Sequence, residues 1–105
     1  MIITRTPFRV SFVGGGSDIK DFYIQHEGAV LSTSIKKYIY ISSQSFFHKT
    51  GYRLKYSKTE TTDSLEKIQH PIFREALKMF DLEGLELCSI ADIPSGTGLG
   101  SSSTF

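Results

Sequence analysis

The chain has few of the features that stabilise secreted domains or anchor membrane proteins. Its 105 residues include one cysteine, Cys88, so no disulfide can form within the chain. That cysteine sits in the apolar segment "LELCSI", which favours a buried structural thiol over a nucleophile. No apolar run approaches the roughly 20 residues that a membrane-spanning helix needs. The composition therefore argues against a disulfide scaffold and against a helical membrane protein.

A secretory signal is also missing from the start of the chain. The first residues, "MIITRTPFRVSFV", place arginines inside what would have to be the apolar part of such a signal. With a single cysteine in addition, the sequence predicts a cytoplasmic, reducing location.

No charge of either sign is in clear excess. Twelve Lys and Arg face eleven Asp and Glu, which gives a formal net charge of +1. Nucleic-acid-binding proteins usually concentrate basic charge, so we expect no nucleic-acid partner. Local basic patches at Lys36 and Lys37, or at Arg53, Lys55 and Lys58, are an alternative to the simpler interpretation of solvated strand edges.

The first half of the chain is typical of β-strands. The segment "FRVSFV" (8–13) alternates apolar and polar residues, and so does "YRLKYS" (52–57), with a hairpin turn expected at Gly51 before it. Between them, 29–35 and 37–47 are rich in β-branched and aromatic residues.

The period changes in the second half of the chain. In "HPIFREALKMF" (70–80) apolar residues recur at helical spacing, and Pro71 suits the first helical position. A strand over 85–90, a loop over 91–98 and a new helix from Gly100 follow. A run of strands followed by helix, strand, loop and helix predicts an α+β fold. The last helix would hold about six residues, too few to be stable alone, so we expect the chain to be the front part of a longer protein.

Two glycine-rich segments interrupt this pattern. "GGGSD" (14–18) breaks the first strand, and Ser17 or Asp18 is a candidate cap for a short helix after it. "IPSGTGLGSSSTF" (93–105) has glycines at alternate positions, which permit positive φ and let successive amides form a cradle for phosphate oxygens. A helix N-terminus behind such a loop adds a positive dipole end.

Two common phosphate-binding patterns do not fit the second segment. The P-loop pattern fails because no lysine follows Lys78, and the dinucleotide pattern fails because the spacing is G-x-G-x-G. A flexible linker is the alternative interpretation, which Pro94 and the preceding strand make less favourable.

Both segments match motifs of one family. "PSGTGLGSSS" (94–103) resembles the P-x-x-x-G-L-x-S-S-[AS] signature of the GHMP kinases, named for galacto-, homoserine, mevalonate and phosphomevalonate kinases. "TPFRVSFVGGGSD" (6–18) is similar to the family's first motif, and "EGAVLSTSIKKYIYI" (27–41) is typical of the strands between them. The resemblance implies an N-terminal, ATP-binding domain of the ribosomal-protein-S5-domain-2-like α+β type. Over residues 1–105 this domain would be incomplete, ending at the start of the phosphate-loop helix, with the C-terminal domain absent.

The resemblance also implies an ATP site and a sugar site. The glycine loop would wrap the triphosphate of ATP, and Ser101 or Ser102 would hold Mg²⁺, whereas Leu99 would pack inward. Arg9 matches an arginine near the transferring phosphate, with an exposed strand arginine as the alternative. The sugar would be bound by Gly15, Gly16, Ser17 and Asp18. The residues implied for ATP are Ser95, Gly96, Thr97, Gly98, Leu99, Gly100, Ser101 and Ser102.

The implied reaction is transfer of the γ-phosphate of ATP to a sugar hydroxyl. Galactokinases carry Glu-His where this chain has Gly15 and Gly16, and the "GGGSD" form resembles D-glycero-D-manno-heptose 7-phosphate kinases instead. Fucose and galactose are alternative substrates, and mevalonate or homoserine fits less well. The family's catalytic aspartate has no counterpart up to Phe105, so the 105 residues alone are expected to be inactive. Two further alternatives are a nucleotide-binding module without catalysis and an RNA-binding module, because S5-like folds also bind RNA.

Overall fold

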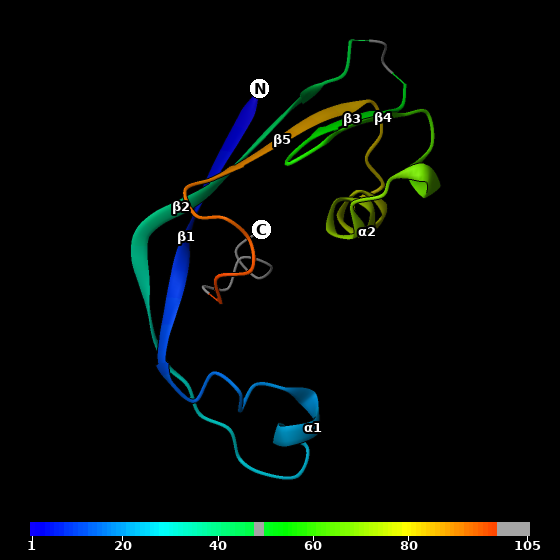
Figure 1. Ribbon diagram of the computed structural model, residues 1–105. Coiled ribbons are helices and arrows are strands. Elements are labelled where there is room, and N and C mark those ends of the chain that lie inside the picture. The colour runs from blue at the N-terminus through cyan, green and yellow to red at the C-terminus, as the bar shows by residue number, and fades with distance from the viewer. Residues whose placement is uncertain (48–49, 99–105) are drawn as a thin grey trace. The chain divides into compact units, whose positions relative to one another are not determined.

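A computed structural model describes residues 1–47 and 50–98 and shows a mixed α+β fold, as predicted. The strands form one five-stranded sheet in the order β1-β2-β5-β3-β4 (Figure 1). None of the described helices is long and apolar enough to cross a membrane. The elements are β1 (Ile2–Val13), α1 (Lys20–Tyr23), β2 (Leu31–Ser45), β3 (Tyr52–Lys55), β4 (Thr59–Thr62), the 3₁₀ helix η1 (Leu65–Lys67), α2 (Pro71–Met79) and β5 (Leu85–Ala91).

The chain divides into two compact units, which we describe separately. The sheet unit holds Met1–Arg5 and Tyr40–Ile90, and the loop unit holds Thr6–Ile39 and the segment that starts at Ala91. The long strands β1 and β2 contribute residues to both units.

Strand pairing in the sheet unit corrects one prediction. β3 pairs in parallel with β5, and β4 pairs antiparallel with β3 from Tyr52↔Thr62 to Lys55↔Thr59. A parallel pair needs a long crossover, and the connection from β3 to β5 contains α2. The hairpin turn predicted at Gly51 is wrong, because β5 lies between β2 and β3. The hairpin is β3–β4, whose loop is 56–58.

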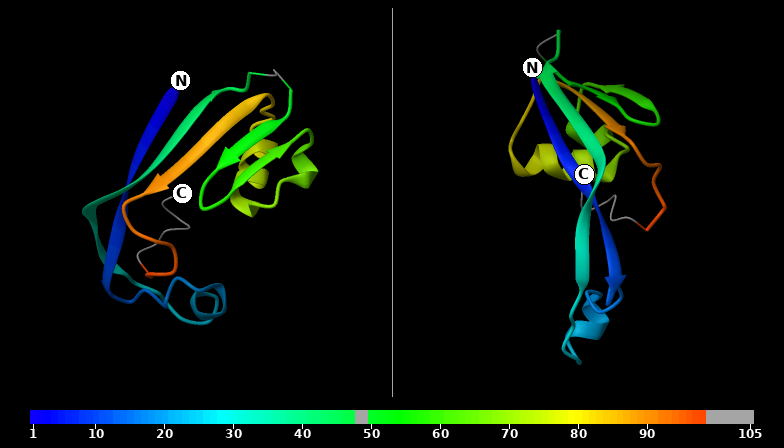
Figure 2. Two further views of the ribbon diagram at one scale, coloured as in Figure 1. Left: turned by 45° about the horizontal axis from the view of Figure 1, so that its top comes forward. Right: turned by 90° about the vertical axis from the view of Figure 1, so that its left-hand side faces the viewer.

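The buried residues of the sheet unit recur at the spacing of a strand in β3 and at the spacing of a helix in α2. Tyr52 and Leu54 alternate inward along β3, and Phe73 and Leu77 face inward from α2 at a spacing of four residues. In the ribbon views α2 lies along one face of the β3–β4–β5 strands (Figure 2). The helix begins at Pro71, as predicted, and ends at Met79, so that Phe80 is left exposed.

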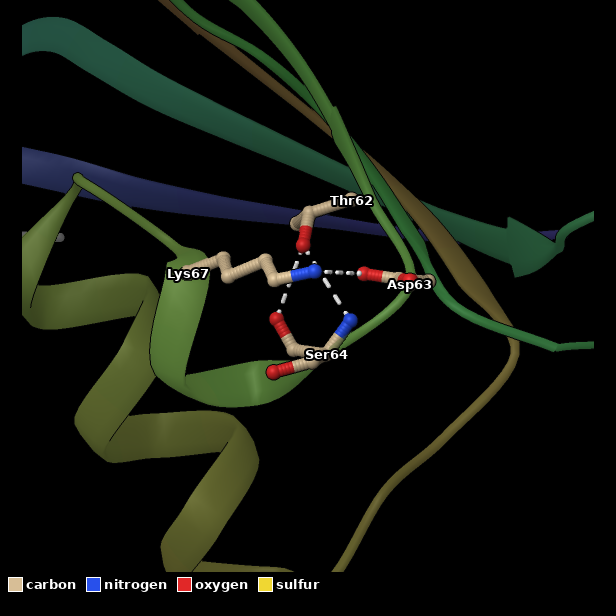
Figure 3. A network of polar contacts seen from close by, with 4 residues as sticks. All are labelled: Thr62, Asp63, Ser64 and Lys67. Carbon is tan, nitrogen blue, oxygen red and sulfur yellow. Dashed lines mark hydrogen bonds and ion pairs between the residues drawn. The ribbon is translucent and has the colours of Figure 1, made fainter.

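The connection from β4 to α2 is held by short-range polar contacts (Figure 3). The Thr62 hydroxyl donates to the Ser64 carbonyl at 2.9 Å and accepts from the Ser64 N–H at 3.1 Å. Lys67 Nζ lies 2.9 Å from Asp63 Oδ1, and its hydrogen bond holds the pKa of Asp63 below the ordinary value. Both charged side chains are exposed, so this pair adds little to stability.

Tyr56 and Glu60 form the other polar contact of this hairpin. The Tyr56 hydroxyl donates to Glu60 Oε1, and the Gln69 N–H donates to Oε2 at 2.7 Å. The hydrogen bond to Glu60, together with burial, raises the pKa of Tyr56 to about 12. Burial raises the pKa of Glu60, but the hydrogen bonds from Tyr56 and Gln69 outweigh it and the pKa is lowered.

We predict a late tyrosine titration that depends on this contact. A tyrosine with a raised pKa stabilises the fold below its ordinary pKa of 10.0, and that contribution is lost as the pH rises through about 12. In an ultraviolet titration, the wild type minus Tyr56→Phe difference should show one tyrosinate forming near pH 12. Glu60→Gln should move that step toward pH 10.0. A difference curve centred at 10.0 in the wild type would contradict the prediction.

Candidate functional site

The first glycine-rich segment, residues 14–18, is called the first loop. It follows β1, and Gly14 has a φ of 83°. A Cβ atom on Gly14 would lie 1.9 Å from the Ala29 carbonyl oxygen, and the Ser17 N–H donates to the Gly14 carbonyl at 2.9 Å. Gly14 is therefore required both by backbone conformation and by close contact with the chain before β2.

Ser17 fastens the first loop to that same segment. Its hydroxyl lies 2.7 Å from the Gly14 carbonyl and 3.0 Å from the Ala29 carbonyl, and it accepts from the Ala29 N–H at 3.1 Å. A Cβ on Gly28 would lie 2.5 Å from the Ser17 carbonyl oxygen, so this contact also requires glycine. Ser17 thus hydrogen-bonds to backbone groups at both ends of the connection between β1 and β2.

The predicted helix cap at Ser17 or Asp18 is wrong. α1 begins at Lys20, its N-cap residue is Ile19, and no side chain donates or accepts a capping hydrogen bond there. The reason is that the Ser17 hydroxyl turns toward residue 29 instead. α1 lies within the connection between β1 and β2 (Figure 1).

Gly15 and Gly16 differ from Gly14 in that the fold does not require them. Neither has a φ in the left-handed region. Among the described atoms, a Cβ on Gly16 would meet none within 4 Å, and one on Gly15 would meet only the Ser11 Cβ, at 3.7 Å. Glycine at both positions leaves the backbone accessible to a ligand.

Asp18 is exposed beside these two glycines. Within the described part of the chain no hydrogen bond or ion pair engages its carboxylate, which leaves it available to a ligand. It borders a shallow cavity of about 290 Å³ lined by Ser17, Asp18, Tyr23, Gly28, Ala29 and Val30.

Arg9 lies on β1, five positions before Gly14, and is half-buried. On the same strand Phe8 is fully buried, whereas Phe12, which the alternation over 8–13 places on the same face as Phe8, is 68% exposed.

The second loop comprises residues 93–98, which follow Asp92 after the end of β5. Gly96 and Gly98 both have positive φ, 83° and 72°, and a Cβ on either would meet no atom of residues 1–47 and 50–98 within 4 Å. The Thr97 hydroxyl donates to the Pro94 carbonyl at 3.3 Å. Glycines in the left-handed region with open space around them suit a backbone that presents amides to an anion. Both loops belong to the loop unit.

Part of the predicted ATP site lies outside the described residues. Leu99, Gly100, Ser101 and Ser102, and with them the expected helix and Mg²⁺ contact, fall in 99–105. Within 1–47 and 50–98, no three His, Cys, Asp or Glu side chains gather as in a metal site.

Sequence reasoning missed three residues that shape these loops. Gly14 and Gly28 are needed because each lies against backbone from the opposite side of the β1–β2 connection. Asp92 bonds to β2 through both its backbone and its side chain. No local pattern predicts the contacts of these residues, because each of their partners is distant in the sequence.

The known proteins to which this chain is similar are kinases. No family model matches the chain. A D-glycero-alpha-D-manno-heptose 7-phosphate kinase of Campylobacter jejuni is 32% identical over 115 residues, which cover 98% of this chain and 34% of the relative. The crystal structure of a D-glycero-D-manno-heptose 1-phosphate kinase from Bacteroides thetaiotaomicron superposes with a TM-score of 0.81 at 19% identity, covering 98% of this chain and 38% of that one. The mevalonate kinase of Methanococcus jannaschii superposes with a TM-score of 0.71 at 18% identity, covering 98% and 36%.

These comparisons identify the fold of the chain. The chain has the fold of the N-terminal region of the GHMP kinases, which confirms the resemblance shown by its two motifs. It spans 34–38% of the length of the relatives described above.

Proposed function

We propose that the protein is an ATP-dependent sugar kinase that transfers the γ-phosphate of ATP to a sugar hydroxyl, with D-glycero-D-manno-heptose 7-phosphate as the sugar. The observation that carries the proposal is the pair Gly15 and Gly16 beside the exposed Asp18, two glycines that the fold does not need. The Campylobacter jejuni relative, whose name specifies heptose 7-phosphate, supports the choice of sugar.

In this proposal the first loop binds the sugar phosphate. Without side chains at Gly15 and Gly16, a bulky or phosphorylated sugar can approach the backbone amides. The Asp18 carboxylate accepts hydrogen bonds from sugar hydroxyls, and such charge-assisted bonds are among the stronger ones in proteins. Ser17 contributes by holding the loop in place. Arg9 would lie near the transferring phosphate.

The second loop would bind the triphosphate of ATP. Gly96 and Gly98 suit this role because their conformation is open to a close ligand. Phosphoryl transfer depends mainly on positioning and on neutralising charge, and backbone amides with one Mg²⁺ ion supply both. The proposed binding set also includes Ser95, Thr97, Leu99, Gly100, Ser101 and Ser102, with Mg²⁺ at one of the last two.

We predict that Gly98→Val weakens ATP binding about tenfold or more, because a β-branched side chain at a φ of 72° is strained and blocks the backbone. Equilibrium dialysis of ATP against the full-length gene product measures this Kd. Gly84→Ala is the control, since Gly84 also has a positive φ, 68°, but lies in the sheet unit. It should cost stability and leave the Kd unchanged. An unchanged Kd in Gly98→Val would mean that this loop does not bind ATP.

The substrate is tested with the full-length gene product, ATP, Mg²⁺ and a panel of heptose 7-phosphate, fucose, galactose and mevalonate. We expect the highest kcat/KM with heptose 7-phosphate. A higher value with fucose or galactose would overturn the heptose assignment and keep the sugar kinase. The isolated residues 1–105 should bind ATP without turnover, and measurable turnover would contradict the expected position of the catalytic base.

The same samples also test the alternative that the protein binds RNA. RNA binding that depends on salt and is retained in Gly98→Val would favour it.

A further inference from the structure

Asp92 is hydrogen-bonded to β2 directly before the second loop. Its N–H donates to the Tyr38 carbonyl at 2.9 Å, and its carboxylate Oδ2 accepts from the Tyr38 N–H at 2.8 Å. Asp92 therefore engages both backbone polar groups of Tyr38. Both residues belong to the loop unit.

This pairing differs from a regular strand pair in one respect. In an antiparallel hydrogen-bonded pair, each residue donates its N–H and accepts with its own carbonyl oxygen. Here the side-chain carboxylate of Asp92 takes the place of the carbonyl as acceptor. The chain bends at Asp92 and Ile93, directly after β5 ends at Ala91.

We propose that Asp92 is a positioning residue for ATP binding by the described part of the second loop, up to Gly98. This inference rests on the proposed function above. It fixes the point and direction at which the second loop leaves the sheet, four residues before Gly96. Only the acceptor oxygen is needed for this, since the donor is an N–H that any residue but proline supplies. The negative charge itself gives no advantage next to a triphosphate.

The test compares Asp92→Ala with Asp92→Asn in the full-length gene product. Losing one hydrogen bond to a charged group should raise the Kd and KM for ATP about fivefold or more in Asp92→Ala, with the KM for the sugar unchanged. Asp92→Asn keeps an acceptor oxygen and should restore ATP binding to within about twofold of the wild type.

Thr4→Val is the matched control. It removes the 3.3 Å hydrogen bond from the Thr4 hydroxyl to the Ile41 carbonyl, a side-chain contact to the same strand β2 within the sheet unit. This variant should leave the Kd for ATP unchanged, whatever it does to stability.

Several results would overturn the proposal: an unchanged ATP Kd in Asp92→Ala, a parallel rise in the KM of both substrates, or equal impairment in Asp92→Asn. If Asp92→Ala does not fold, Asp92→Glu, which displaces the acceptor by one methylene, must still bind ATP more weakly than Asp92→Asn. If the wild type binds ATP but phosphorylates no sugar, the proposed function is refuted and the proposal on Asp92 is not. Equilibrium dialysis then still measures how each Asp92 variant changes the Kd for ATP. A wild type that binds no ATP overturns both.

Discussion

Replacing Gly14 with alanine should lower the free energy of unfolding by about 3 kcal/mol, the largest stability loss that we expect from any change in the first loop. The new Cβ would lie 1.9 Å from the Ala29 carbonyl oxygen, and the φ of 83° is strained for any residue with a side chain. Relief requires the first loop to separate from the start of β2, which breaks the Ser17 contacts to Ala29. Urea denaturation of the full-length gene product measures the loss.

Gly16→Ala is the matched control for this substitution. The same methyl group meets nothing within 4 Å at Gly16, where φ lies outside the left-handed region. Stability should stay the same or rise by up to about 1 kcal/mol, because alanine restricts the unfolded chain. Equal losses of stability in Gly14→Ala and Gly16→Ala would contradict the conclusion that the fold requires glycine at position 14 but not at position 16.

Asp18→Asn should lower kcat/KM for the sugar about tenfold to a hundredfold and leave the melting temperature unchanged. The variant retains the shape of the side chain but removes the charge that strengthens a hydrogen bond to a sugar hydroxyl. No stability loss is expected, because α1 is capped at Ile19 without help from a side chain. Steady-state kinetics and thermal unfolding of the same sample measure the two quantities.

Asp21→Asn controls for the change in net charge. Asp21 lies in the first turn of α1, is exposed like Asp18 and lies outside the proposed sugar site. It should leave kcat/KM unchanged. A lower melting temperature with normal kinetics in Asp18→Asn would contradict a role in substrate binding.

The elements that were predictable from the sequence are those whose pattern is repeated over several residues. α2 was found from its apolar spacing and from Pro71, and β5 from its apolar run. β4 was not predicted, because its sequence "TETT" has no apolar alternation and its pairing comes from the hairpin with β3. β2 is a single strand from Leu31 to Ser45, whereas two strands were expected over 29–35 and 37–47.

The candidate site was predictable in outline only. The motifs indicated both glycine loops. They did not show that a Cβ on Gly14 would collide with Ala29, whereas one on Gly16 would meet no described atom within 4 Å. They also gave no signal for Asp92, whose partner Tyr38 lies on another strand. Such roles depend on contacts between distant parts of the chain, which a local pattern does not record.

The most direct test of the proposed sugar kinase is the sugar-dependent release of ADP. The full-length gene product is incubated with ATP, Mg²⁺ and D-glycero-D-manno-heptose 7-phosphate, and ADP is measured against a reaction without sugar. We predict ADP formation that requires the sugar, matches the amount of sugar phosphorylated and falls in Asp18→Asn. No ADP above the background with any heptose, fucose or galactose derivative would contradict the proposed function.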